Sequence, residues 1–245
     1  MSIRASISLR GAFLLESLLM IANNLIFFSI WWFFFREFSD INGWKIDDIT
    51  ATMTILSGAF GIAHICLGGV KNLGTIIRSG DLDSFMTQPK PLLLYLIASK
   101  SHSKGWGHII SAAILIGFTS STSLFLVVLF MISGCLILTS VGIIIHSLTF
   151  WLGSIESVSQ KYLDSLFVFA LYPTNIYSGI LKLLMFTLIP AGLIGYMPVE
   201  LLHHFSWLKL IILLASSLGF SGLSLIVFYL GLKKYESGNG FVVRF

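Results

Sequence analysis

The stretch LFLVVLFMISGCLILTSVGIIIHSLTFW occupies residues 124–151 and decides the fold class. It contains no Asp, Glu, Lys or Arg. About 20 apolar residues in a helix are enough to cross the hydrocarbon core of a membrane, which is about 30 Å thick. Backbone polar groups find no water in that core, so a spanning segment of this kind must be helical. We therefore expect residues 124–151 to form a transmembrane helix.

Further apolar runs flank this stretch on both sides. The uncharged region extends over residues 105–155, and the Ser/Thr cluster at 119–123 predicts a turn that divides it into two spans. Pro173 and Asn175 predict a break after an interfacial helix that begins near residue 165. The other expected spans are residues 11–35, 49–70, 180–196 with a kink at Pro190, and 208–232. The sequence thus predicts an all-α integral membrane protein with six transmembrane helices.

The overall composition agrees with this reading. Of the 245 residues, 56% are hydrophobic and 11% are charged, whereas a soluble domain carries about 25% charged residues. No segment is polar enough to form a second, water-soluble domain. We expect residues 1–245 to form a single transmembrane domain.

The basic residues indicate how the chain is oriented. With six spans, twelve of the fifteen Lys and Arg residues lie at the termini or in the segments on the same side as the termini, and three lie on the other side. Basic residues concentrate in cytoplasmic loops of membrane proteins. Both termini and the 71–104 loop are therefore expected to be cytoplasmic.

The sequence lacks the motifs of several catalytic and binding sites. It contains no GxxxxGK[ST] phosphate loop, no GxGxxG and no HExxH. His203 and His204 are adjacent, so on a helix they point about 100° apart and do not face one ion. The scattered basic residues argue against nucleic acid as a partner. We expect no metal site, no ATPase site and no catalytic residue in this chain.

Three polar residues fall within or at the ends of the expected spans: Glu16, His64 and His146. One interpretation is structural, with the histidines hydrogen-bonded between helices and Glu16 paired or partly solvated near the interface. The other interpretation places them along a substrate path. The sequence leaves both open.

The loop after the second expected span carries the most informative pattern. Residues 80–89 read GDLDSFMTQP. Gly80 can end one helix, and the Asp81 carboxylate can cap the next one. Leu82, Phe85 and Met86 follow i, i+3, i+4 spacing, which predicts one apolar face, and Pro89 ends the helix. A short helix of this kind can lie on the membrane or insert into a groove of a soluble partner.

This loop resembles the G-x-L-D-x-x-L-x-x-P stretch of ABC-2 type permeases, and the chain resembles the bacterial ABC-2 family once described as a domain of unknown function. Two further regions agree in order and spacing: YPTNIY at 172–177 with FTLIP at 186–190 and YMP at 196–198, and GLKKYESGN at 231–239. One departure is Met86-Thr87-Gln88, where relatives tend to carry leucines and an arginine. The resemblance covers essentially the whole chain.

The resemblance implies a function. Such permeases have six spans, cytoplasmic termini and a coupling helix between the second and third spans that docks on a separate ATPase subunit. Two permeases, either copies of one chain or two related chains, and two ATPases form an exporter in the bacterial cytoplasmic (inner) membrane. ATP and Mg²⁺ would then be bound by the ATPase and no cofactor by this chain, whose other partner is membrane lipid. The coupling residues implied here are Gly80, Asp81, Leu82, Asp83, Phe85, Met86 and Pro89.

Two alternatives remain at this stage. A secondary transporter would need coupling-ion residues near the middle of the membrane, and the spans hold almost no carboxylate or cation there. A membrane-embedded enzyme would need a catalytic constellation. The transported substrate cannot be read from the sequence.

Overall fold

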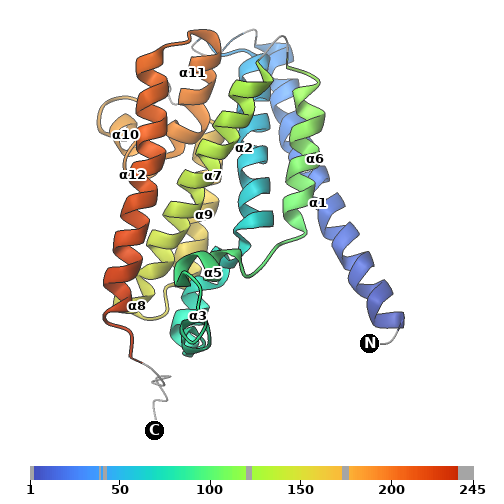
Figure 1. Cartoon of the computed structure of the whole chain (residues 1–245). Helices are drawn as coiled ribbons and strands as arrows, with labels where there is room; N and C mark the ends of the chain where they lie inside the picture. The colour runs from blue at the N-terminus through green and yellow to red at the C-terminus, as the bar shows by residue number, and fades with distance from the viewer. Residues whose placement is uncertain (1–2, 39, 41–42, 120–122, 173–176, 237–245) are drawn as a thin grey trace.

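The computed structural model describes residues 3–38, 40, 43–119, 123–172 and 177–236, with side chains from residue 10 onward. Within these residues the protein is all-helical and has no strand, as predicted. The helices form an upright bundle (Figure 1). The expected turn at 119–123 and the expected break at Pro173 and Asn175 fall wholly or partly outside the described residues.

Four helices are long and apolar enough to cross a membrane. They are α1 (Ile3–Glu37), α2 (Ile46–Cys66), α7 (Leu124–Ser147), which continues into α8 (Thr149–Leu152), and α12 (Trp207–Leu232). These helices correspond to the first, second, fourth and sixth expected spans. Each of these helices is apolar around most of its circumference, as is typical of helices that face lipid or a protein interior.

Two shorter helices accompany the four long ones. Helix α6 (Lys104–Ile116) packs against α2 and α1, and α9 (Glu156–Leu171) packs against α2 and α7. At 1.5 Å per residue they are about 20 and 24 Å long, less than the membrane core of about 30 Å. A count of six crossings therefore stays a prediction.

Helix α2 forms the centre of the bundle. Of its most apolar window, 72% is buried, against 6% for α1 and 22% for α12. Thr50, Thr52 and Thr54 lie on this buried helix, and each hydroxyl donates to the carbonyl four residues earlier. These bonds satisfy the hydroxyls inside an apolar environment.

Serine hydroxyls join α7 to α12. Ser133 and Ser217 are 2.6 Å apart, and Ser140 donates to Ser221 at 3.2 Å. Hydrogen bonds of this kind, together with small side chains, hold membrane helices together where no hydrophobic driving force acts between them.

The expected fifth span at 180–196 is wrong as a single helix. This region contains α10 (Gly179–Leu184), a turn with Pro190, and the π-helix η3 (Gly192–Tyr196), which leads into α11 (Met197–His203). Pro190 lacks the N–H that a continuous helix needs. Both η3 and α9 pack against α2 and α7, with Leu193 and Ile194 of η3 and Leu166 and Ala170 of α9 buried.

The bundle has two chemically different ends. We call the end that carries the start of α1, the segment between α2 and α6, α8 and the end of α12 the basic end, and the other the far end (Figure 1). At the basic end the segment between α2 and α6 folds into η1 (Gly68–Asn72), α3 (Leu73–Ser79), α4 (Leu82–Met86) and α5 (Leu92–Ala98). We call these four helices the connecting unit.

Candidate functional site: the connecting unit and the basic cavity

The connecting unit has a hydrophobic core of its own, which is anchored to the bundle. Buried apolar side chains from each of its helices pack together with Ile143 of α7 and Phe228 of α12. The connecting-unit members of this core are Val70, Leu73, Ile76, Ile77, Leu82, Leu93, Leu96 and Ile97. One hydrophobic core therefore contains side chains from the unit and from two long helices.

The boundaries of the expected coupling helix are largely confirmed. Gly80 ends α3 with a left-handed backbone, φ 82°, a conformation that glycine adopts without steric cost. Helix α4 starts at Leu82 and ends at Met86, before Pro89. Helix α5 follows Pro91 and buries Leu93, Leu96 and Ile97.

The expected cap by Asp81 is wrong. Its carboxylate accepts a hydrogen bond from the Ser79 hydroxyl at 2.7 Å, and no side-chain cap of α4 forms. The Asp81 carbonyl instead accepts the backbone N–H of Ser84 at 3.1 Å. The serine two residues earlier competes for the carboxylate, because local side-chain donors are an alternative to helix capping.

The expected exposed apolar face of α4 is also partly wrong. Leu82 is fully buried in the unit's core, and the half-buried Phe85 packs against the ring of Tyr95, with centroids 5.2 Å apart. Only Met86 is solvent-facing, at 50% exposure. The exposed surface of α4 and of the segment after it includes Met86, Gln88 and Pro89.

Tyr235 fastens the unit to the end of α12, and sequence reasoning gave it no role. Its hydroxyl donates to the carbonyl of Gly80 at 3.1 Å, and its ring meets the edge of Phe150. Burial, followed by a hydrogen bond and repulsion from Asp83, raises the pKa of Tyr235 to about 12. The phenol therefore stays a hydrogen-bond donor at physiological pH.

A cavity of about 500 Å³ opens between α1, α2, α6, α7 and α9, next to the connecting unit. We call it the basic cavity. The charged and imidazole side chains of its lining, together with Gln160, lie toward the basic end: His64, Lys71, Lys104, His108 and Asp164. Asn23 and Thr139 are the other polar residues of the lining. Deeper in the bundle its walls include Phe27, Phe60, Leu138 and Phe167.

The histidines of this region are held in different ways. Asn24 donates to His108 Nδ1 at 3.2 Å; an amide nitrogen only donates, so the His108 proton sits on Nε2. His102 Nε2 pairs with the carbonyl of Gly68 at 3.0 Å. The Nδ1 atom of His64 is buried and has no partner among the described residues.

The three intramembrane candidates end up in three different surroundings. His64 lines the basic cavity and stacks on His108, with ring centroids 5.6 Å apart. His146 is buried outside the cavity lining, and neither ring nitrogen has a partner among the described residues. Glu16 is exposed on α1 and accepts a hydrogen bond from the Ser103 hydroxyl. A substrate-contacting role stays a prediction for each.

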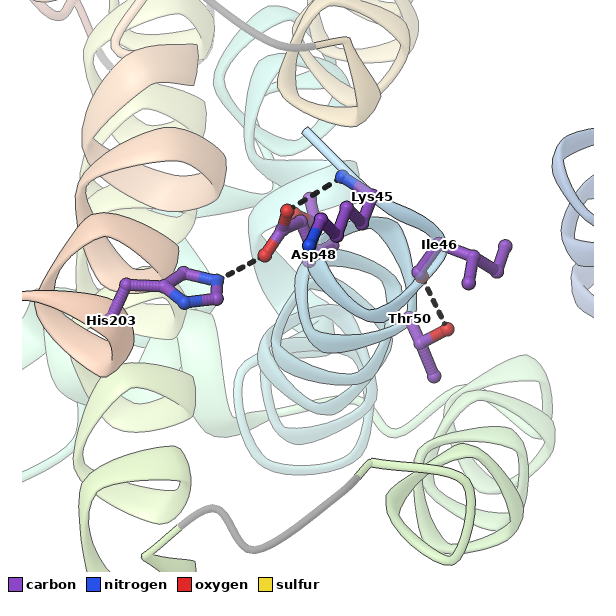
Figure 2. A network of polar contacts seen from close by, with 6 residues as sticks. Lys45, Ile46, Asp48, Thr50 and His203 are labelled. Atoms are coloured by element: carbon purple, nitrogen blue, oxygen red, sulfur yellow. Dashed lines mark hydrogen bonds and ion pairs between the residues drawn. The ribbon is translucent and has the colours of Figure 1, made fainter. Parts of the chain in front are cut away.

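At the far end a polar network ties α2 to α11 (Figure 2). The Asp48 carboxylate accepts the backbone N–H of Lys45 at 2.7 Å, and its other oxygen pairs with Nε2 of His203. Lys209 and Glu200 form an ion pair at 2.7 Å nearby. Among the described residues, no group of three or more His, Cys, Asp or Glu is arranged to hold a metal ion.

Comparison with curated proteins finds no match, and neither does comparison with solved structures. The model of the family described as ABC-2 family transporter protein matches residues 18–239. The match covers α1 from residue 18 onward, the other three long helices, the connecting unit and the basic cavity. With its several apolar helices, the chain is a multi-pass membrane protein that belongs to the ABC-2 family of transporters.

Proposed function

We propose that this chain is the permease subunit of an ABC exporter of the bacterial cytoplasmic membrane. A separate ATPase subunit hydrolyses ATP, and the permease carries an unidentified substrate across the membrane. The observation that carries the proposal is the connecting unit, which stands at one end of the bundle and shares a core with α7 and α12. Family membership supports the assignment to transport.

In this proposal the basic end faces the cytoplasm and the connecting unit receives the ATPase. Closure of the ATPase pair displaces the unit, and the shared core passes the displacement to α7 and α12. The nucleotide favours one of two bundle arrangements because the ATPase holds the unit differently in each. A second permease, identical or related, completes the translocation path, and six crossings place both termini on the cytoplasmic side.

The docking surface provides the test. Met86→Glu introduces a charge at the exposed tip of α4, where it opposes burial against a partner. The permease is co-expressed with a candidate ABC ATPase subunit from the same genome, and co-purification and ATP hydrolysis are measured. We expect Met86→Glu to reduce both by about tenfold or more, as loss of a central interface residue does.

Phe205→Glu is the matched control. Phe205 is similarly exposed, at 46% against 50% for Met86, but lies at the far end. The Phe205→Glu variant should insert into the membrane normally and keep the wild-type level of ATPase binding. Equal ATPase binding by Met86→Glu and by the wild type, at equal expression, would contradict docking at α4.

A further inference from the structure

The basic cavity combines two features that point to a ligand. Its polar lining includes the half-buried Lys71 and the exposed Lys104, and its deeper part is lined by aromatic and aliphatic side chains. At about 500 Å³ it falls within the range of about 300–1,000 Å³ that is typical of small-molecule sites. It lies within one chain, so one copy of the chain supplies all of these lining groups.

The two lysines lack partners in the part of the chain that the structure describes. Neither ammonium forms an ion pair with a carboxylate there, since the recorded pairs are Asp48–His203 and Glu200–Lys209. Asp164 lies on the same cavity wall as Gln160, whose amide donates to it at 2.8 Å. One carboxylate thus faces two ammonium groups, which leaves the cavity with an uncompensated positive charge.

Burial and the neighbouring Lys104 charge lower the pKa of Lys71, and Asp164 opposes this effect. An ammonium group that is half-buried next to another cation is stabilised by an anion, because opposite charges attract more strongly where water is excluded. The imidazole rings of His64 and His108 also line the cavity.

The apolar walls indicate that the part of the ligand beyond its anionic group is apolar. Phe60 lies one turn before His64 on α2, and Phe167 lies one turn after Asp164 on α9, both toward the middle of the bundle. Phe60 and Phe167 meet edge to face with centroids 5.0 Å apart. A molecule with its anionic group at Lys71 and Lys104 would therefore place an apolar body against these rings.

We propose that the basic cavity binds an anionic amphiphile, a phosphate or carboxylate group on a hydrocarbon or aromatic body. Lys71 and Lys104 hold the anion, and Phe27, Phe60, Leu138 and Phe167 hold the apolar body. The same chemistry describes an acidic membrane lipid and a free amphiphilic acid. As a statement about what is transported, the inference rests on the proposed function; as a statement about binding, it does not.

The test uses the full-length permease alone in neutral detergent micelles, with binding followed by native mass spectrometry. The probes are dioleoyl phosphatidic acid, dioleoyl phosphatidylcholine, octyl phosphate and inorganic phosphate. We expect phosphatidic acid or octyl phosphate to bind about tenfold or more tightly than phosphatidylcholine or inorganic phosphate, because charge-assisted hydrogen bonds and apolar contact both contribute. If octyl phosphate binds, a free amphiphilic acid is sufficient to occupy the cavity. If phosphatidic acid binds and octyl phosphate does not, the ligand is an acidic lipid.

Charge variants locate the site. The double variant Lys71→Gln, Lys104→Gln should weaken binding by about tenfold or more. The control Lys100→Gln, Lys161→Gln removes the same charge at the same end but outside the cavity lining, and should leave binding within about twofold, as expected for exposed charges. Leu163→Trp, which fills the cavity without changing its charge, should also weaken binding.

Three results would overturn the inference. They are equal binding of phosphatidylcholine and phosphatidic acid, an equal loss of binding affinity in the control double variant and in Lys71→Gln, Lys104→Gln, or tight binding of inorganic phosphate alone. The outcome is separate from that of the docking experiment. A permease that binds the amphiphile but no ATPase contradicts the proposed function, and one that engages the ATPase but no amphiphile contradicts this inference.

Discussion

Gly80 and Tyr235 touch although 155 positions separate them in the chain. The contact joins the backbone turn between α3 and α4 to a residue shortly beyond the end of α12. The carbonyl of Gly80 accepts a hydrogen bond from the phenol hydroxyl, which adds to the shared hydrophobic core in holding the connecting unit on the bundle. Tyr235 is therefore a positioning residue, acting through the turn rather than on any substrate.

Removing this hydroxyl gives a direct prediction. Tyr235→Phe keeps the ring packing on Phe150 and loses the bond to Gly80, which should cost about 1 kcal/mol of stability. Limited proteolysis within the connecting unit should become faster, and thermal unfolding in detergent should shift downward. Tyr229→Phe, which removes a hydroxyl from an exposed position on α12, is the control and should change neither measurement.

The same phenol predicts a pH dependence. The pKa of Tyr235 is raised from 10.0 to about 12 in the folded protein. Its contribution to stability is therefore complete below pH 10 and is lost as the pH rises through 12. Thermal unfolding measured across this window should fall more steeply with pH for the wild type than for Tyr235→Phe. Parallel pH profiles would contradict the role of the phenol.

Residue-scale predictions from sequence succeeded where the determinant is local. The end of α3 at Gly80 follows from the freedom of glycine to adopt positive φ, and the structure has this conformation. The prediction that Asp81 caps α4 failed because the Asp81 carboxylate accepts a hydrogen bond from the Ser79 hydroxyl instead. The Tyr235 contact had no local signal, since it depends on two segments from opposite parts of the chain.

At the scale of helices, hydropathy identified α1, α2, α7 and α12 and misplaced the fifth span. Helix α9 begins in a polar stretch, and its first turns place Gln160 and Asp164 on the cavity lining. A helix whose polar residues face an internal cavity scores poorly for hydropathy although it packs within the bundle. The apolar 180–196 region scores well but is interrupted at Pro190.

The crossing of α1 and α6 depends on a small residue. A Cβ atom at Gly107 would lie 2.4 Å from the carbonyl oxygen of Ser17 on α1. Because that neighbour is backbone, Gly107→Ala should separate the two helices and destabilise the protein by about 1–3 kcal/mol. The expected result is a clear decrease in the midpoint of thermal unfolding in detergent.

Gly222→Ala is the control for this prediction. Gly222 lies within α12, and a Cβ atom there meets nothing within 4 Å. The control should leave the midpoint unchanged or raise it slightly, because alanine favours the helix over glycine. Similar decreases for both variants would show that α1 and α6 do not depend on close approach at Gly107.

For the whole molecule, the orientation in the membrane is the prediction to test. Gln88 at the basic end and His204 at the far end are both exposed. In a background with Cys66→Ala and Cys135→Ala, Gln88→Cys should resist an impermeant thiol reagent in intact cells and react after permeabilisation. His204→Cys should react in intact cells, and the reverse pattern would invert the topology predicted from basic residues.

The contact between Gly80 and Tyr235 also has a consequence for biosynthesis. The connecting unit is synthesised before α6, α7, α9 and α12, whereas Tyr235 follows α12. A nascent or truncated permease that lacks Tyr235 therefore presents a unit without this hydrogen bond. We expect assembly with a partner to await synthesis of this residue, so that the contact reports that the preceding helices have all been made.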